Sequence, residues 1–90
     1  MEKVEGKVLK IQEFKEIKKK EGDITFLLKF LIEDSTGNIV VNVWEMQAVE
    51  GFKIIKEGIS VSLSDVHVKF NSYSKQNELN FTKNTILKVI

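Results

Sequence analysis

Hydrophobic and polar positions alternate on both sides of the segment Asp34-Ser35-Thr36-Gly37, which predicts a β-hairpin with a four-residue loop. Asp34 can accept hydrogen bonds from the loop amides, and Gly37 supplies the positive φ that such a loop usually needs. Successive side chains of a strand point to opposite faces, so the flanking residues separate into two sets. The set expected to face the core comprises Phe26, Leu28, Phe30 and Ile32 before the loop and Ile39, Val41 and Val43 after it.

The other face of this predicted hairpin has a mixed composition. Its members are Thr25, Leu27, Lys29, Leu31 and Glu33 before the loop and Val40, Asn42 and Trp44 after it. A large aromatic ring among amide, ammonium and aliphatic side chains suits neither a core nor an ordinary solvated surface. We therefore interpret this mixed face as a binding surface.

The segment before the hairpin begins with a long predicted strand over residues 4–14. Its apolar positions change parity between Val8 and Leu9, which predicts a β-bulge, and Gly6 suits a strongly coiled position. The charged segment 15–23 that follows has two interpretations. It is either a solvated loop or a flexible lysine arm beside the mixed face, and the two are compatible.

The pattern becomes helical after the hairpin. Residues 45–52 predict one short, weakly amphipathic helix that ends at Gly51. Met46, Val49 and Phe52 recur at three-residue spacing, so we expect these side chains to fill the core.

The last part of the chain predicts further strands. Residues 59–70 alternate cleanly but change parity at Asp65, which predicts a second bulge. A polar loop over 71–77 then leads into a fifth strand that includes residues 79–81. The apolar segment 86–90 is expected to close on the first strand.

Length and composition restrict the class of protein. Ninety residues with 42% hydrophobic and 30% charged residues fit one globular domain, residues 1–90. The sequence contains no signal peptide and no apolar run long enough to span a membrane, so no membrane association is expected. Cysteine is absent and His67 is the single histidine, which excludes disulfides and disfavours a zinc site. These features fit a reducing cytoplasm, and we expect a cytoplasmic protein.

The charge pattern bears on nucleic-acid binding. The net charge is only +1, so any attraction to phosphates must come from local patches. All 14 basic residues are lysines, and the bidentate reading of base edges by arginine is therefore excluded. If a nucleic acid binds, the sequence favours non-specific contacts to its backbone.

Five strands, two bulges and a short helix between the third and fourth strands predict an all-β, five-stranded barrel with the element order of the oligonucleotide/oligosaccharide-binding fold, or OB-fold. Particular segments share the order and spacing of a known group of OB domains; these segments are Val4-Glu5-Gly6-Lys7-Val8-Leu9, residues 33–39, Val43-Trp44, Lys56-Glu57-Gly58 and Glu78-Leu79. Over nearly its whole length, the chain resembles single-stranded-DNA-binding OB domains. It is most similar to archaeal single-strand-binding proteins and domains of replication protein A.

The resemblance implies single-stranded DNA as the ligand, RNA as an alternative ligand, and replication or repair proteins as further partners. It implies that Trp44 stacks on a base, that Leu31 belongs to an apolar platform, and that Tyr73 is an aromatic loop residue at the site. A further stacking aromatic is implied near the end of the fourth strand, where Phe70 is the first candidate and His67 the second.

Polar side chains on or beside the mixed face complete the candidate site. Lys29, Lys69 and Lys75 are placed to contact phosphates, and Lys10 reaches the face from the first strand. Asn42 can donate a hydrogen bond to a base. For each of these residues, ordinary solvent exposure is the alternative interpretation.

No sequence pattern indicates catalysis. The sequence lacks a glycine-rich phosphate loop, a nucleophile constellation and a catalytic carboxylate pair, so we expect a protein that is not an enzyme and needs no cofactor. Two alternatives to single-stranded DNA binding remain: assembly with a partner subunit through Leu27, Leu31 and Trp44, or binding of tRNA or structured RNA. The near-neutral charge favours assembly, whereas the outward Trp44 among lysines favours nucleic acid.

Overall fold

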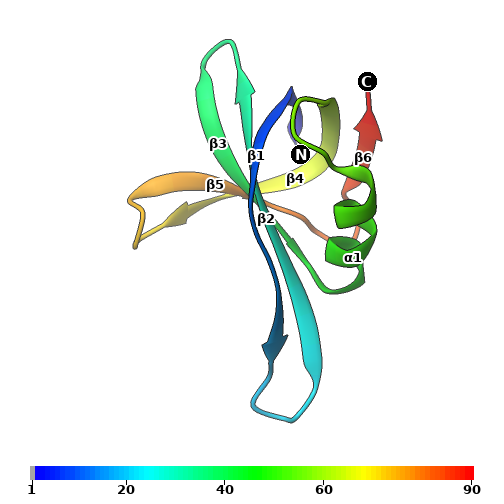
Figure 1. Ribbon diagram of the computed structural model, residues 1–90. Coiled ribbons are helices and arrows are strands. Elements are labelled where there is room, and N and C mark those ends of the chain that lie inside the picture. Colours follow the sequence, from blue (N-terminus) through cyan, green and yellow to red (C-terminus); the bar gives the residue numbers. More distant parts are fainter. Residues whose placement is uncertain (1) are drawn as a thin grey trace.

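Six strands and one helix make up residues 2–90, the part of the chain that the computed structural model describes (Figure 1). The elements are β1 (Glu2–Lys18), β2 (Ile24–Asp34), β3 (Gly37–Trp44), α1 (Glu45–Ile54), β4 (Ser60–Asn71), β5 (Gln76–Asn80) and β6 (Ile86–Val89). The helix follows β3 directly, where the sequence predicts it.

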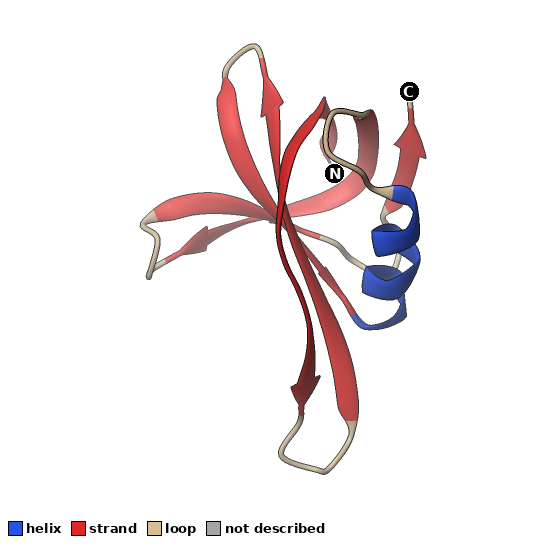
Figure 2. Cartoon of the chain, in the orientation of Figure 1, coloured by secondary structure: helices blue, strands red, loops and turns tan. Residues whose placement is uncertain are grey.

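The strands close into a ring in the order β1-β2-β3-β5-β4, and β4 pairs back onto β1 (Figure 2). Every pairing is antiparallel except that of β3 with β5, which is parallel. The expectation that residues 86–90 close on the first strand was wrong. Residues 61–64 of β4 pair with β1 as well as with β6, so β1 closes the ring and β6 lies along the other edge of β4.

Three irregularities in the ladders bend the long strands. The register of β1 with β2 shifts at Leu9 and again at Gln12, which confirms the predicted bulge and adds a second one. The other predicted bulge is at Asp65, whose φ is +59° and opposite which the register with β1 shifts. An aspartate tolerates this left-handed conformation better than most residues. These bulges let β1 pair with β2 along one part and with β4 along another.

The core lies inside the ring and is built from the residues that alternation assigned to it. Leu28, Phe30, Ile32, Val41 and Val43 are fully buried, and Phe26 and Ile39 pack against them. Inward residues of the other strands and the helix complete the core; they are Val8, Ala48, Ile55, Val61, Leu63, Val66 and Leu79. The predicted inner faces of β2 and β3 are therefore confirmed.

The helix differs from the prediction in length. It continues through Gly51 to Ile54, with no interruption at the glycine. Gly51 is buried, and a Cβ atom there would lie 3.3 Å from Cδ2 of Leu28. The glycine therefore allows α1 to pack closely on β2 and does not end the helix.

The helix also presents a different face to the core. Met46 and Phe52 are 64% and 43% exposed and Val49 is half-buried, whereas Ala48 and Ile55 are buried. The prediction that Met46, Val49 and Phe52 fill the core was wrong. Close packing at the small residues Ala48 and Gly51 determines which side of this weakly amphipathic helix faces the barrel.

The charged segment 15–23 is shorter as a loop than expected. Strand pairing between β1 and β2 continues to Lys18 and Ile24, so only residues 19–23 form the turn. The hairpin projects from the barrel (Figure 1). At its base the Phe14 ring stacks on Phe52 of the helix, with centroids 4.1 Å apart.

The turn between β2 and β3 is also tighter than expected. The ladder extends to the pair Asp34–Gly37, which leaves a two-residue turn. Asp34 Oδ1 accepts hydrogen bonds from Thr36 Oγ1 (2.6 Å) and from Thr36 N (2.7 Å), and both lower the pKa of Asp34. Gly37 has the predicted positive φ, +139°.

Candidate functional site

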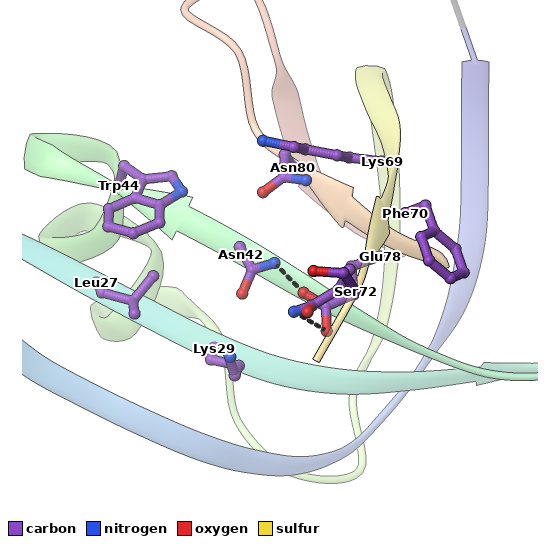
Figure 3. A pocket seen from close by; sticks show the side chains of 10 residues that line it. Leu27, Lys29, Asn42, Trp44, Lys69, Phe70, Ser72, Glu78 and Asn80 are labelled. Atoms are coloured by element: carbon purple, nitrogen blue, oxygen red, sulfur yellow. Dashed lines mark hydrogen bonds between the residues drawn. The ribbon is translucent and has the colours of Figure 1, made fainter. Parts of the chain in front are cut away.

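The mixed face of β2 and β3 borders a hollow of about 340 Å³ that the β4–β5 hairpin closes on its far side (Figure 3). The predicted site residues that line this hollow, which we call the central hollow, are Lys29, Asn42, Trp44, Lys69 and Phe70. β2, β3 and the end of β4 thus bring together side chains that are up to 41 positions apart in the sequence.

A neighbouring hollow of about 610 Å³ contains two further predicted residues. Leu31 and Lys75 line it, together with Phe70 and Val40. Phe70 lines both hollows, so they adjoin at this residue.

Trp44 is the largest aromatic side chain of the central hollow. It ends β3 and is 41% exposed, as expected for a residue of the outward face. Leu27 is its direct partner across the β2–β3 ladder and is only 6% exposed. Leu27 therefore lies on the predicted face but offers little surface to a ligand.

Sequence reasoning missed Glu78 of β5, which lines the central hollow, as it did Asn71, Ser72 and Asn80. Oε1 of Glu78 accepts a hydrogen bond from Asn42 Nδ2 (2.8 Å) and its Oε2 accepts one from Asn71 Nδ2 (3.1 Å) (Figure 3). Oε2 also accepts a hydrogen bond from Ser74 Oγ (3.4 Å). Burial raises the pKa of this carboxyl. The three hydrogen bonds and the charge of Lys29 lower the pKa by more than burial raises it, so the net shift is downward. Asn42 is only 6% exposed. Its side-chain amide is bonded to Glu78 and is therefore not free to project from the surface.

Phe70 is exposed and is not a core residue. It continues the parity of Val66, which is buried, but the β4–β5 hairpin carries it beyond the core, where 59% of its surface is exposed. His67, the second candidate, is exposed opposite Asn80 and lies outside both hollows.

Two other predicted residues flank the hollows. Tyr73 is 98% exposed in the loop between β4 and β5, where its backbone N–H donates to Asn71 Oδ1 (2.9 Å). Lys10 is exposed on β1 and pairs with Leu31 across the ladder. Both border the surface without lining either hollow.

The lysines of this surface are available for an anionic ligand. In the described part of the chain, ion pairs join Lys3 with Glu5, Lys15 with Glu13 and Lys19 with Glu45. None of these pairs involves the predicted site lysines, which are Lys10, Lys29, Lys69 and Lys75. Residues 2–90 also contain no group of three or more side chains suited to hold a metal ion, and no helix among them is long and apolar enough to cross a membrane.

Solved structures with the same arrangement identify the fold. The second OB-fold domain of replication protein A from Methanococcus maripaludis superposes with a TM-score of 0.75 at 24% identity, covering 98% of this chain and 81% of that one. The fold is an OB-fold. DNA binding domain A of replication protein A from S. cerevisiae gives a TM-score of 0.79 at 17% identity, with 98% and 81% coverage.

A replication protein A heterotrimer bound to ssDNA is a third OB-fold relative. Its TM-score is 0.85 at 13% identity. The match covers 98% of this chain but only 21% of the heterotrimer chain. The sequence matches no protein-family model and no curated protein. The OB-fold resemblance expected from the sequence is confirmed by these structures.

Proposed function

We propose that this OB-fold domain binds single-stranded DNA with little sequence preference. The observation that carries the proposal is the exposed indole of Trp44 beside a hollow whose lysines take part in none of the ion pairs found in residues 2–90. OB-folds bind oligonucleotides on the face of their second and third strands and between the 1–2 and 4–5 loops. The central hollow lies on that face.

The chemistry of the surface supports stacking on bases together with contacts to phosphates. Bases stack on Trp44 and Phe70, with Leu31 as an apolar platform, and each stacked base contributes about 1–3 kcal/mol. Lys29, Lys69 and Lys75 then contact phosphates as point charges. Stacking accepts every base, because every base has a flat π-face.

The flanking residues have secondary roles in this proposal. Tyr73 offers an aromatic ring at the end of the β4–β5 hairpin, and Lys10 offers a charge along β1. His67 is exposed on β4 but lines neither hollow, so it has no assigned contact in this proposal.

Two of the structural relatives support the choice of ligand. One is a replication protein A heterotrimer in complex with ssDNA, and the other is a DNA binding domain. Assembly with a partner subunit through Leu27, Leu31 and Trp44 has less support, because Leu27 is almost fully buried.

Substitution of the two aromatic residues tests the proposal. Trp44→Ala and Phe70→Ala should each weaken binding of a labelled oligo-dT by about 5–150-fold, the equivalent of about 1–3 kcal/mol, in fluorescence anisotropy. Ile54→Ala, which removes a half-exposed apolar side chain at the end of α1, is the matched control and should bind as the wild type does. Unchanged affinity of both aromatic variants, with circular dichroism showing that they are folded, would contradict the proposal.

A further inference from the structure

Trp44 lines a further hollow in addition to the central one. We call it the distal hollow, and it measures about 420 Å³. Its lining consists of Trp44 at the end of β3, Glu45, Met46 and Gln47 at the start of α1, and Phe81, Thr82 and Lys83 after β5. Trp44 is the residue that lines both. A strand that stacks on the indole is therefore adjacent to the distal hollow as well.

The distal hollow combines apolar surface with a positive charge. Met46 of α1 is 64% exposed, and Phe81, which lines the hollow with it, is half-buried. Lys83 is exposed and takes part in none of the ion pairs found in residues 2–90. The carboxylate of Glu45 also lines the hollow, but it is paired with Lys19 at 3.4 Å.

The turn that carries Lys83 is held in place by hydrogen bonds. Gln47 Nε2 on the helix donates to the carbonyl of Thr82 (2.9 Å), and Thr82 N donates to Thr85 Oγ1 (2.7 Å). The hydroxyl groups of Thr82 and Thr85 both donate to the carbonyl of Asp65 on β4 (3.2 and 2.8 Å). Lys83 is thus presented at the rim of the hollow from a fixed backbone.

We infer that the distal hollow is a further nucleotide subsite, in which the strand continues past Trp44. A base lies against Met46 and Phe81, whose flexible thioether and aromatic ring accept any base, and a phosphate contacts Lys83. The inference rests on the proposed function, because it requires that a strand occupies the central hollow. It extends the contact surface from the mixed face of the barrel to the helix and the turn after β5.

The length of the oligonucleotide provides the test. Wild-type protein, Lys83→Ala and Met46→Ala are titrated with an oligo-dT series that is lengthened one nucleotide at a time, and binding is followed by anisotropy of a labelled strand. Both variants should bind the shortest oligomers as the wild type does and should bind the longer ones severalfold more weakly. For Lys83→Ala the salt slope, log K against log salt, should also fall by about 0.7 on the long oligomers, the value for one lost phosphate contact on a single strand.

Lys88→Ala is the matched control, because Lys88 is exposed on β6 and lines neither hollow. Its affinities should equal those of the wild type at every length. Lys83→Ala with wild-type affinity at all lengths would overturn the distal subsite and leave the proposed function intact. An equal loss at all lengths would overturn it too, because Lys83 would then belong to the central hollow. Absence of binding by the wild-type protein would contradict the proposed function itself.

Discussion

At the scale of single residues, Glu78 is an acidic group in a surface proposed to bind an anion. Glu78 is 7% exposed, and its carboxylate accepts hydrogen bonds from Asn42, Asn71 and Ser74. These contacts connect β3, the end of β4, the β4–β5 loop and β5. The charged carboxylate of Glu78 therefore stabilises the wall of the central hollow. Lys29 beside it compensates part of the charge.

Replacing Glu78 should reveal this structural role. Glu78→Gln leaves two amide donors with one acceptor oxygen, so we expect the free energy of unfolding at neutral pH to fall by about 1–3 kcal/mol. The pKa of Glu78 is lowered from 4.5, so the stabilisation by its charged form is present above pH 4.5 and is lost as the pH falls through the folded-state pKa. Thermal melts between pH 7 and pH 3 should show the difference between wild type and variant narrowing in acid. A difference that stays constant over this range would contradict the assignment.

Trp44 and Val41 lie on opposite faces of β3 and should respond differently to truncation. Trp44 is 41% exposed, so Trp44→Ala should cost clearly less than the ~3–5 kcal/mol typical of a buried tryptophan. Val41 is fully buried, and Val41→Ala should cost about 1–3 kcal/mol without a direct effect on DNA affinity. Chemical denaturation of both variants measures these costs. A loss of about 3–5 kcal/mol for Trp44→Ala, the cost of a buried tryptophan, would show that the indole is a packing residue.

At the scale of elements, β1 closes the barrel by passing from β2 to β4. Gly6 lies at this crossing, and a Cβ atom there would be 2.9 Å from the carbonyl oxygen of Glu33. Gly6→Ala should therefore force the strands apart and lower the free energy of unfolding by about 1–3 kcal/mol. Its neighbour Lys7 is exposed, so Lys7→Ala should stay within about 0.5 kcal/mol of the wild type. Equal stability of the two variants in urea would contradict this view of the crossing.

Most of the strands could be predicted because alternation is a local signal. The inner faces of β2 and β3, the bulge at Leu9 and the bulge at Asp65 follow from parity alone, as does the outward position of Trp44. The length of α1 could not be read in this way, because Gly51 serves close packing against Leu28, a contact 23 positions away in the sequence. In the sequence Gly51 predicts the end of the helix, whereas in the structure it allows close packing within the helix.

The missed parts of the site depend on pairing between strands that are not consecutive. Glu78 meets Asn42 because β5 pairs in parallel with β3, which nothing in the local pattern of residues 76–80 indicates. The partner of β6 was missed for the same reason. Phe70 was selected for its aromatic ring, and its exposure follows from its place on the β4–β5 hairpin beyond the core.

At the scale of the whole molecule, the charge distribution limits the electrostatic part of binding. The net charge is +1 and the surface of the two site hollows contains three lysines, Lys29, Lys69 and Lys75. Three phosphate contacts on a single strand correspond to a slope of log K against log salt of about −2. Titrations between 50 and 200 mM salt, a range over which such contacts are readily resolved, measure this slope. A value much steeper than this would mean that lysines elsewhere on the barrel contact the strand.

The most direct test of the account is a titration of the intrinsic fluorescence of Trp44 with oligo-dT at low salt. Trp44 is the single tryptophan of the chain, so its emission reports on the surface around this one indole. We predict saturable quenching by oligomers in the range of about 4–16 nucleotides that one OB-fold occupies, with reversal by added salt. Unchanged emission of the folded protein in excess oligo-dT at low salt would contradict the account.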